Sequence, residues 1–329
     1  MAEIRTRTLC LIGVLLGGIS APPSAAAQGQ PDVIWKSQAK SGYLWAVAFS
    51  PDGQMVATAD GLDPLYDPCT GELLYPGEGT VRLWNASDGT LLQSRTEDQA
   101  SVVSVAISPD SLRLASGPVL KLWNLPDLAS FEVLSGGARS LSFSPDGQLL
   151  AVGMGGYNNA VKVFTADGTF LQSLPFSSWV TVVTFSSDSR LLAVGNATAI
   201  QIYRTSDWQF ERIIFPQHGV NGVSALTFSP DGETLASSGL TTKLWHIPDG
   251  ELIREFEGVG PIAFSPDGQV LLTTGQQISF WNVSDGSLLR MYDRGALILS
   301  VAFSPDNSAF AYALLPGNVV VARNPLAGS

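Results

Sequence analysis

The chain has 329 residues and a formal net charge of −11, with 45% hydrophobic and 14% charged residues. This apolar content excludes an intrinsically disordered chain, and the acidity argues against a nucleic-acid partner, which would need a basic face. Two His and two Cys are too few for an array of zinc fingers or for a disulfide framework.

Residues 1–27 have the composition of a secretory signal peptide. Arg5 and Arg7 carry positive charge, residues 9–19 form an apolar run, and three alanines at 25–27 provide a cleavage site before Gln28. The apolar run is too short to cross roughly 30 Å of hydrocarbon as a helix. We therefore expect export to the periplasm or the extracellular space without a stable membrane anchor. An uncleaved signal anchor is the alternative.

Residues 28–329 are expected to form one domain, because a short motif recurs along them. The motif is Ser-Pro-Asp in six copies and Ser-Ser-Asp in one. The copies begin at Ser50, Ser108, Ser144, Ser186, Ser229, Ser265 and Ser304. Pro fixes φ, and the Gly that often follows tolerates a positive φ, so each copy predicts a tight turn. Most copies lie roughly 40 residues apart, a period typical of repeat architectures.

The same pattern of strands surrounds each copy. Large and small side chains alternate before the turn, as in residues 47–49, and a second apolar strand follows it. A third strand ends in an aromatic residue such as Trp84 or Trp245, and a second turn leads to a fourth strand. Alternation with a period of two indicates β-strands. Four short antiparallel strands in roughly 40 residues predict a blade of a β-propeller, so the fold class is all-β with seven blades.

The last repeat predicts how the ring closes. Its strands at residues 299–303, 309–314 and 318–323 leave no room for a fourth before the sequence stops at Ser329. Residues 32–38 form a strand-like segment that precedes the first repeat and has no blade of its own. We expect this segment to complete the seventh blade, which would cover an open sheet edge. Deleting residues 28–40 should then lower stability or cause aggregation.

The chain resembles WD40-repeat proteins over nearly all of residues 31–325. The resemblance rests on the Phe-Ser-Pro-Asp-Gly segments and on the Leu-Trp-Asn segments at 83–85 and 122–124. It implies a seven-bladed propeller whose loops bind proteins. The family's Gly-His before the first strand is absent, with His218 about one residue out of register, and so is its Asp before the third strand. We therefore expect the family's Asp–His–Ser–Trp network to be reduced to its Trp, and rigidity to come mainly from apolar packing between blades.

The first interval between repeats is the longest, which places an insertion at residues 60–79. In the WD40 architecture this insertion lies on the top face, with the loops that lead into each blade. It carries Tyr66, Cys69 and Tyr75. A long loop on a rigid scaffold is a candidate partner site, and a passive excursion is the alternative. Cys69 is expected to be buried, and a free thiol or an intermolecular disulfide is the alternative.

A second group of candidates precedes or begins the innermost strands. Trp45, Arg139 and Trp179 should ring the upper mouth of the central channel, and His218 lies in a top loop. Aromatic residues and Arg are favoured at protein interfaces, so these side chains are candidate partner contacts. A further set of basic residues recurs at one position of the third strands and is expected to face solvent. These residues are Arg82, Lys121, Lys162 and Lys243.

Signals for chemistry are weak. His218 and His246 should lie at opposite ends of one blade, roughly 20 Å apart, so they cannot share a metal ion. The insertion's three aspartates, Asp60, Asp63 and Asp67, miss the EF-hand spacing. We predict no catalytic residue, cofactor or metal. The expected function is a non-enzymatic scaffold that binds a protein or peptide on its top face. The alternative is an exported enzyme or small-ligand-binding protein that uses the channel mouth.

Overall fold

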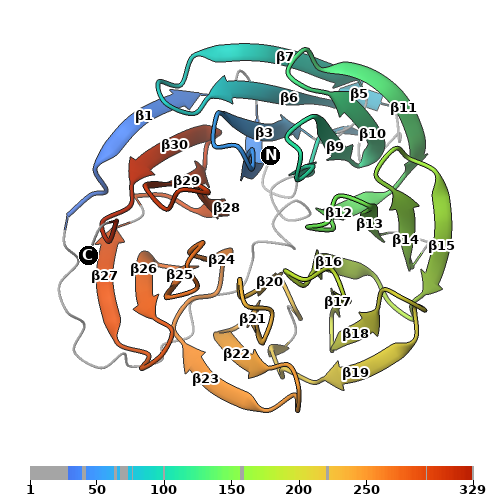
Figure 1. Cartoon of the computed structure of the whole chain (residues 1–329). Helices are drawn as coiled ribbons and strands as arrows, with labels where there is room; N and C mark the ends of the chain where they lie inside the picture. Colours follow the sequence, from blue (N-terminus) through green and yellow to red (C-terminus); the bar gives the residue numbers. More distant parts are fainter. Residues whose placement is uncertain are drawn as a thin grey trace.

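The fold is a closed ring of seven β-sheets, each with four antiparallel strands, in a computed structural model (Figure 1). The structure describes residues 29–38, 42–62, 65–66, 73–75, 77–98, 101–155, 159–219, 222–293 and 295–327. Among these residues, none forms an α-helix, and so no helix has the length and apolar character needed to cross a bilayer. The predicted fold class is confirmed. The predicted signal peptide lies outside the described residues.

The four strands of each blade lie side by side, in order from the central channel to the outside of the ring. The innermost strands are β2 (Tyr43–Phe49), β8 (Ser104–Ile107), β12 (Ala138–Phe143), β16 (Val180–Phe185), β20 (Ala225–Phe228), β24 (Ile262–Phe264) and β28 (Ile298–Phe303). The second strands are β3 (Met55–Leu62), β9 (Arg113–Gly117), β13 (Leu149–Met154), β17 (Leu191–Asn196), β21 (Thr234–Ser238), β25 (Val270–Thr274) and β29 (Ala309–Leu314). The third strands are β6 (Glu78–Asn85), β10 (Val119–Asn124), β14 (Ala160–Thr165), β18 (Ile200–Arg204), β22 (Thr242–His246), β26 (Gln277–Asn282) and β30 (Asn318–Arg323). The outermost strands are β7 (Leu91–Asp98), β11 (Ala129–Gly136), β15 (Phe170–Pro175), β19 (Phe210–Ile214), β23 (Leu252–Phe256), β27 (Leu288–Asp293) and β1 (Val33–Gln38).

The recurring Ser-Pro-Asp turns join the first and second strands and are held by one set of hydrogen bonds. In the first blade, Ser50 Oγ donates to Asp52 Oδ1 (2.5 Å) and accepts from the N–H of Met55 (2.9 Å), while Asp52 Oδ1 accepts from the N–H of Gln54 (3.0 Å). The degenerate copy that begins at Ser186 makes the same bonds. In the second blade, the hydrogen bond from the Ser108 hydroxyl is the largest cause that holds the pKa of Asp110 below its usual value. Pro is thus dispensable in this turn, whereas Ser and Asp bond its backbone.

A hydrogen bond anchors the tryptophan at the end of the third strand in four blades, and it is buried in three of them and partly buried in the sixth blade. The indole N–H donates to a hydroxyl of the second strand at 2.8–2.9 Å in the pairs Trp84–Thr58, Trp123–Ser116, Trp245–Ser237 and Trp281–Thr273. In the fifth blade, His218 Nε2 also lies 2.9 Å from Ser237 Oγ. The expectation that only the tryptophan of the network survives was wrong, because Ser and Thr are common strand residues and their role was not visible in the pattern.

Polar bonds also link neighbouring blades, alongside apolar clusters such as the one that contains Trp35, Val47 and Ala311 at the junction of the seventh and first blades. The outermost strands β19 and β23 each carry an arginine that donates to two carbonyls in the next blade's outer turn. Arg212 bonds the carbonyls of Pro248 and Asp249, and Arg254 bonds those of Ser284 (3.3 Å) and Asp285 (2.7 Å). Guanidinium groups have several donors in a fixed geometry, so one side chain can hold a whole turn.

The ring closes as predicted. β1 pairs antiparallel with β30, and Figure 1 shows the N-terminal strand completing the blade of the C-terminal strands. Trp35 of β1 is buried, and its indole N–H donates to the carbonyl of Ala86 in the first blade (2.8 Å). The first blade is also joined to the seventh by the N–H of Val47, which donates to Ser300 Oγ (3.1 Å). β1 therefore belongs to one blade and packs against the next.

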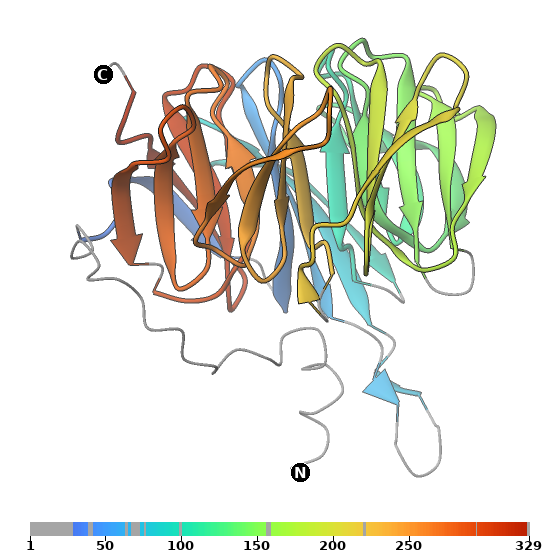
Figure 2. The ribbon, with the colours of Figure 1, turned by 90° about the horizontal axis from the view of Figure 1, so that it is seen from below.

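The insertion between β3 and β6 begins and ends in strand. β3 continues through Leu62 and β6 starts at Glu78, and the remaining segment contains a small hairpin of β4 (Leu65–Tyr66) and β5 (Leu73–Tyr75). This hairpin projects from one face of the ring, which lies at the lower side of Figure 2. We call this face of the ring the top face. Cys69, Asp63 and Asp67 lie outside the described residues.

The lengthened strands β3 and β6 enclose an ion pair. Arg82 is buried and pairs with Asp60, which is 0% exposed. Four basic residues, namely Arg82, Lys121, Lys162 and Lys243, were expected to face solvent. The three lysines are half-buried in the structure. That expectation was wrong for Arg82. Because both strands extend beyond the usual blade length, they bring a buried carboxylate to this arginine.

Candidate functional site

The top end of the innermost strands carries a repeated irregularity. In β2, β12, β16 and β28 one extra residue interrupts the pairing with the second strand, and a β-bulge results. The four extra residues are Trp45, Arg139, Thr181 and Leu299. Each is half-buried, and so is the residue that follows it. Bulges commonly re-aim side chains beside binding sites, so these blades present modified side-chain positions at the channel mouth.

Arg139 and Trp179 are brought into contact there. The guanidinium carbon of Arg139 lies 5.7 Å from the ring centroid of Trp179, within the range of a cation–π interaction. Trp179 directly precedes β16 and is 54% exposed. A Cβ at Gly155 would collide with the side chain of Arg139, so this glycine leaves room for the arginine stem. The pair thus offers a held cation beside an exposed aromatic surface.

Trp45 lies in the first blade and contacts a different partner. Its ring packs edge-on against Tyr43, with centroids 5.4 Å apart. The Trp45 indole N–H is buried and has no hydrogen-bond acceptor within the described part of the chain. The structure therefore joins Arg139 to Trp179 and Trp45 to Tyr43, as two separate aromatic groups at the mouth.

Thr181 and Leu299, the other two bulge residues, were missed by the sequence reasoning. They stand at the same distance before the turn serines Ser186 and Ser304 as Trp45 and Arg139 do before theirs. Alignment on the turn serine would have found the position. The bulge itself leaves no mark in the alternation of side chains, so the sequence pattern had pointed to Trp179 instead.

The remaining predicted contacts are placed differently. The backbones of Tyr66 and Tyr75 lie in the β4–β5 hairpin, and their side chains are outside the described part. His218 is 3% exposed and sits against Ser237 inside the fifth blade. His218 is therefore an interior member of the Trp245–Ser237 hydrogen-bond group and does not extend from the loop as expected.

Burial gives His218 a defined pH effect. Desolvation is the largest cause that lowers its pKa to about 4 from 6.5, with a smaller lowering by Lys243 and an opposing effect of Glu255. The folded protein thus resists protonation that the unfolded chain accepts. This histidine's contribution to stability is complete above pH 6.5 and is lost as the pH falls toward 4. One pKa unit corresponds to about 1.4 kcal/mol, so the loss over this window is about 3 kcal/mol.

We expect His218→Gln to reduce this loss. The measurement is the urea midpoint of wild type and variant at pH 7 and at pH 4.5, because Gln keeps a polar group near Ser237 without titrating. His246 is half-buried and pairs with Asp249 (2.7 Å), so His246→Gln serves as the control. Equal midpoint shifts in wild type and His218→Gln would contradict the assignment.

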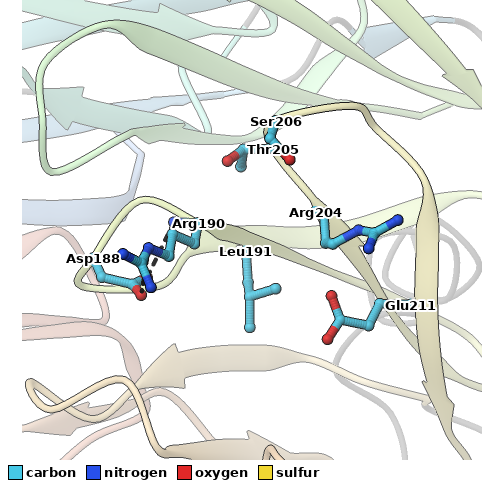
Figure 3. Close-up of a pocket in the computed structure, with 7 residues that line it drawn as sticks. All are labelled: Asp188, Arg190, Leu191, Arg204, Thr205, Ser206 and Glu211. Atoms are coloured by element: carbon cyan, nitrogen blue, oxygen red, sulfur yellow. Dashed lines mark hydrogen bonds and ion pairs between the residues drawn. The ribbon is translucent and has the colours of Figure 1, made fainter.

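A separate hollow of about 410 Å³ lies on the other side of the fourth blade (Figure 3). It is lined by Asp188, Arg190, Leu191, Arg204, Thr205, Ser206 and Glu211. Asp188 belongs to the Ser-Ser-Asp turn, so the hollow lies at the opposite end of the blade from the channel mouth. Arg190 pairs with Asp188 (3.7 Å) and Arg204 with Asp207 (3.0 Å). Within the described ranges, no group of three or more His, Cys, Asp or Glu is arranged to hold a metal ion.

Three segments of the chain match the profile of a known repeat family. The profile of the WD domain, G-beta repeat, matches residues 33–85, 129–165 and 210–246. These three segments are similar to WD40 repeats. Each matched WD40 repeat begins with the outermost strand of one blade and continues with the three inner strands of the next, as in β1 followed by β2, β3 and β6. The staggered repeat agrees with β1 lying in the seventh blade while its sequence neighbours form the first.

Three curated proteins are similar over part of this chain. Apoptotic protease-activating factor 1 of Rattus norvegicus is 28% identical over 196 residues, which cover 56% of this chain and 12% of that protein. WD repeat-containing protein 1 of Xenopus tropicalis is 29% identical over 122 residues, covering 33% and 20%. Actin-interacting protein 1 of Drosophila melanogaster is 24% identical over 205 residues, covering 58% and 33%. The chain therefore matches a third or less of the length of these relatives.

Proposed function

We propose that this WD40 propeller is a non-enzymatic scaffold that binds a protein or peptide at the top mouth of its channel. The observation that carries the proposal is the contact between Arg139 and Trp179, in which an aromatic side chain is left 54% exposed beside a cation. Arg and Trp are enriched among the residues that dominate binding energy at interfaces. An exposed aromatic side chain beside a cation is a surface that a protein partner can cover.

The rigid ring supports this use of the mouth. The N–H of Val183 in β16 donates to Ser140 Oγ in β12 (3.0 Å), so the strand that carries Arg139 is bonded to the strand that Trp179 directly precedes. A partner would meet a site that is already formed and would not have to order it, which favours affinity. The name of one similar protein, actin-interacting protein 1, describes a protein interaction. We further propose that binding takes place after export, on the basis of residues 1–27.

The proposal predicts that Trp179→Ala abolishes partner capture. The purified chain is immobilised, incubated with the exported protein fraction of its source, and bound proteins are quantified by mass spectrometry. Loss of the aromatic contact at the centre of an interface costs about 2 kcal/mol or more, or about thirtyfold in affinity. The matched control is Phe170→Ala, because Phe170 is also 54% exposed but lies on the outermost strand β15.

The supporting result is a stoichiometric protein that Phe170→Ala retains and Trp179→Ala loses, with unchanged melting temperatures. Equal capture by both variants would place the interface elsewhere. Turnover of a small molecule by wild type that Trp179→Ala loses would favour the alternative of an enzyme or small-ligand protein at the mouth.

A further inference from the structure

We propose that the partner segment places a side-chain carboxylate, flanked by apolar residues, on Arg139. This inference rests on the proposed function and specifies the chemistry of its ligand. The occupant we infer is an extended stretch of polypeptide with an internal Asp or Glu that reaches the guanidinium, while a neighbouring apolar side chain covers Trp179.

The charge pattern of the channel wall supports a carboxylate. Arg139 is the one charged residue in the seven innermost strands, all of which are described. The chain as a whole carries −11, so an acidic segment is repelled by the molecule in general and attracted at this point. A single cation matches one carboxylate, whereas a nucleic acid or an anionic membrane would need a cluster of cations.

Arg139 also differs from most of the other described arginines because its donors are uncommitted. Arg82, Arg204 and Arg323 pair with aspartates, and Arg212 and Arg254 bond turn carbonyls. Within the described part of the chain, Arg139 forms no ion pair or hydrogen bond, and its one polar contact is the face of Trp179. Guanidinium groups have five N–H donors that suit a carboxylate in a two-point geometry.

The position of the side chain is set before any ligand arrives. Gly155 leaves space for the arginine stem, and Trp179 holds the guanidinium from one face. Contact with the face of a ring leaves the N–H groups at the edge of the guanidinium available. A carboxylate that approaches this edge lies beside the exposed indole, which explains why we expect acidic and apolar residues next to each other in the ligand.

The test uses the full-length protein and three synthetic libraries of acetylated, amidated nonapeptides on beads. The central residue is fixed as Glu, Gln or Lys, and the other positions are random mixtures of apolar and small residues. Charge-assisted hydrogen bonds contribute about 1.5–3 kcal/mol, so wild type should bind the Glu library about tenfold or more over the Gln library. The preference should decrease as the ionic strength rises.

Arg139→Glu should reverse the preference and bind the Lys library over the Glu library. Arg190→Glu changes the net charge equally, but Arg190 is 85% exposed on the opposite side of the ring and should keep the wild-type preference. If Arg139→Glu lowers the melting temperature, Arg139→Gln replaces it, with equal binding of the Glu and Gln libraries as the expected result.

The outcomes separate this inference from the proposed function. In one outcome, wild type binds the Glu and Gln libraries equally and Trp179→Ala abolishes this binding. That outcome rejects the proposed carboxylate ligand and keeps the peptide site. Wild-type binding that requires a free peptide C-terminus in place of the internal Glu also overturns this inference. No binding of any library overturns this inference, and failure of the capture experiment with Trp179→Ala overturns the proposed function itself.

Discussion

Deleting residues 28–40 is expected to remove most of the folding stability and to make the protein aggregate. The deletion exposes the edge of β30 along its length and takes Trp35 out of a cluster with Leu44, Trp84 and Val321. Loss of a buried tryptophan alone costs about 3–5 kcal/mol, out of about 5–15 kcal/mol for a typical domain. The unpaired edge adds a template for association with other chains.

Chemical denaturation and light scattering measure this effect. Substituting the two exposed apolar residues of β1, Val33→Thr and Ile34→Thr, is the control, because their side chains are 46% and 37% exposed and the strand pairing is kept. The control should unfold at nearly the wild-type midpoint. A truncated protein with the wild-type midpoint and no scattering would show that closure by β1 contributes little.

The second large effect is expected from Arg82→Met. This change removes the only cation that pairs with Asp60 among the described residues and leaves a carboxylate with 0% exposure. Breaking one side of a buried ion pair costs about 3–5 kcal/mol, because the remaining charge is uncompensated. Replacing both partners by apolar residues, as in Asp60→Leu with Arg82→Met, should recover most of that loss.

Urea unfolding of wild type, Arg82→Met and the double variant forms the experiment. Arg95→Met in the same blade is the matched control, because Arg95 is exposed and bonds only exposed groups. Its effect should stay within about 0.5 kcal/mol. If Arg82→Met behaves like Arg95→Met, the pair is not structurally important. If the double variant is as unstable as Arg82→Met, packing and not charge explains the loss.

The blades were predictable because each Ser-Pro-Asp turn fixes the positions of the strands on both sides of it. The hydroxyl of Ser50 and the carboxylate of Asp52 bond the backbone of their own turn, so this local motif marks the start and end of two strands. The missing fourth strand after residue 323 then pointed to residues 32–38, and the structure places β1 there. Local bonding and strand counting together were sufficient for the fold.

The site was less predictable because it depends on interruptions of that regularity. An extra residue at Arg139 turns its side chain without changing the sequence pattern around it. His218 does lie in the loop before β20, but its burial against Ser237 depends on the path of that loop, so the sequence pattern indicated a partner contact. Arg82 shares its repeat position with Lys121, and only the extension of β3 and β6 distinguishes the two. Such features depend on the tertiary structure of one particular blade, and the pattern shared by all repeats does not contain them.

The pairing of β1 with β30 also determines when the protein can finish folding. Six blades are made from continuous stretches of chain and can form in order during synthesis, because their contacts are local. The seventh blade combines the first strand with the last three, so β1 stays unpaired until nearly the entire chain has been made. A chain interrupted before residue 318 has no partner for β1. Ring closure therefore requires that both ends of the propeller are present in the same molecule.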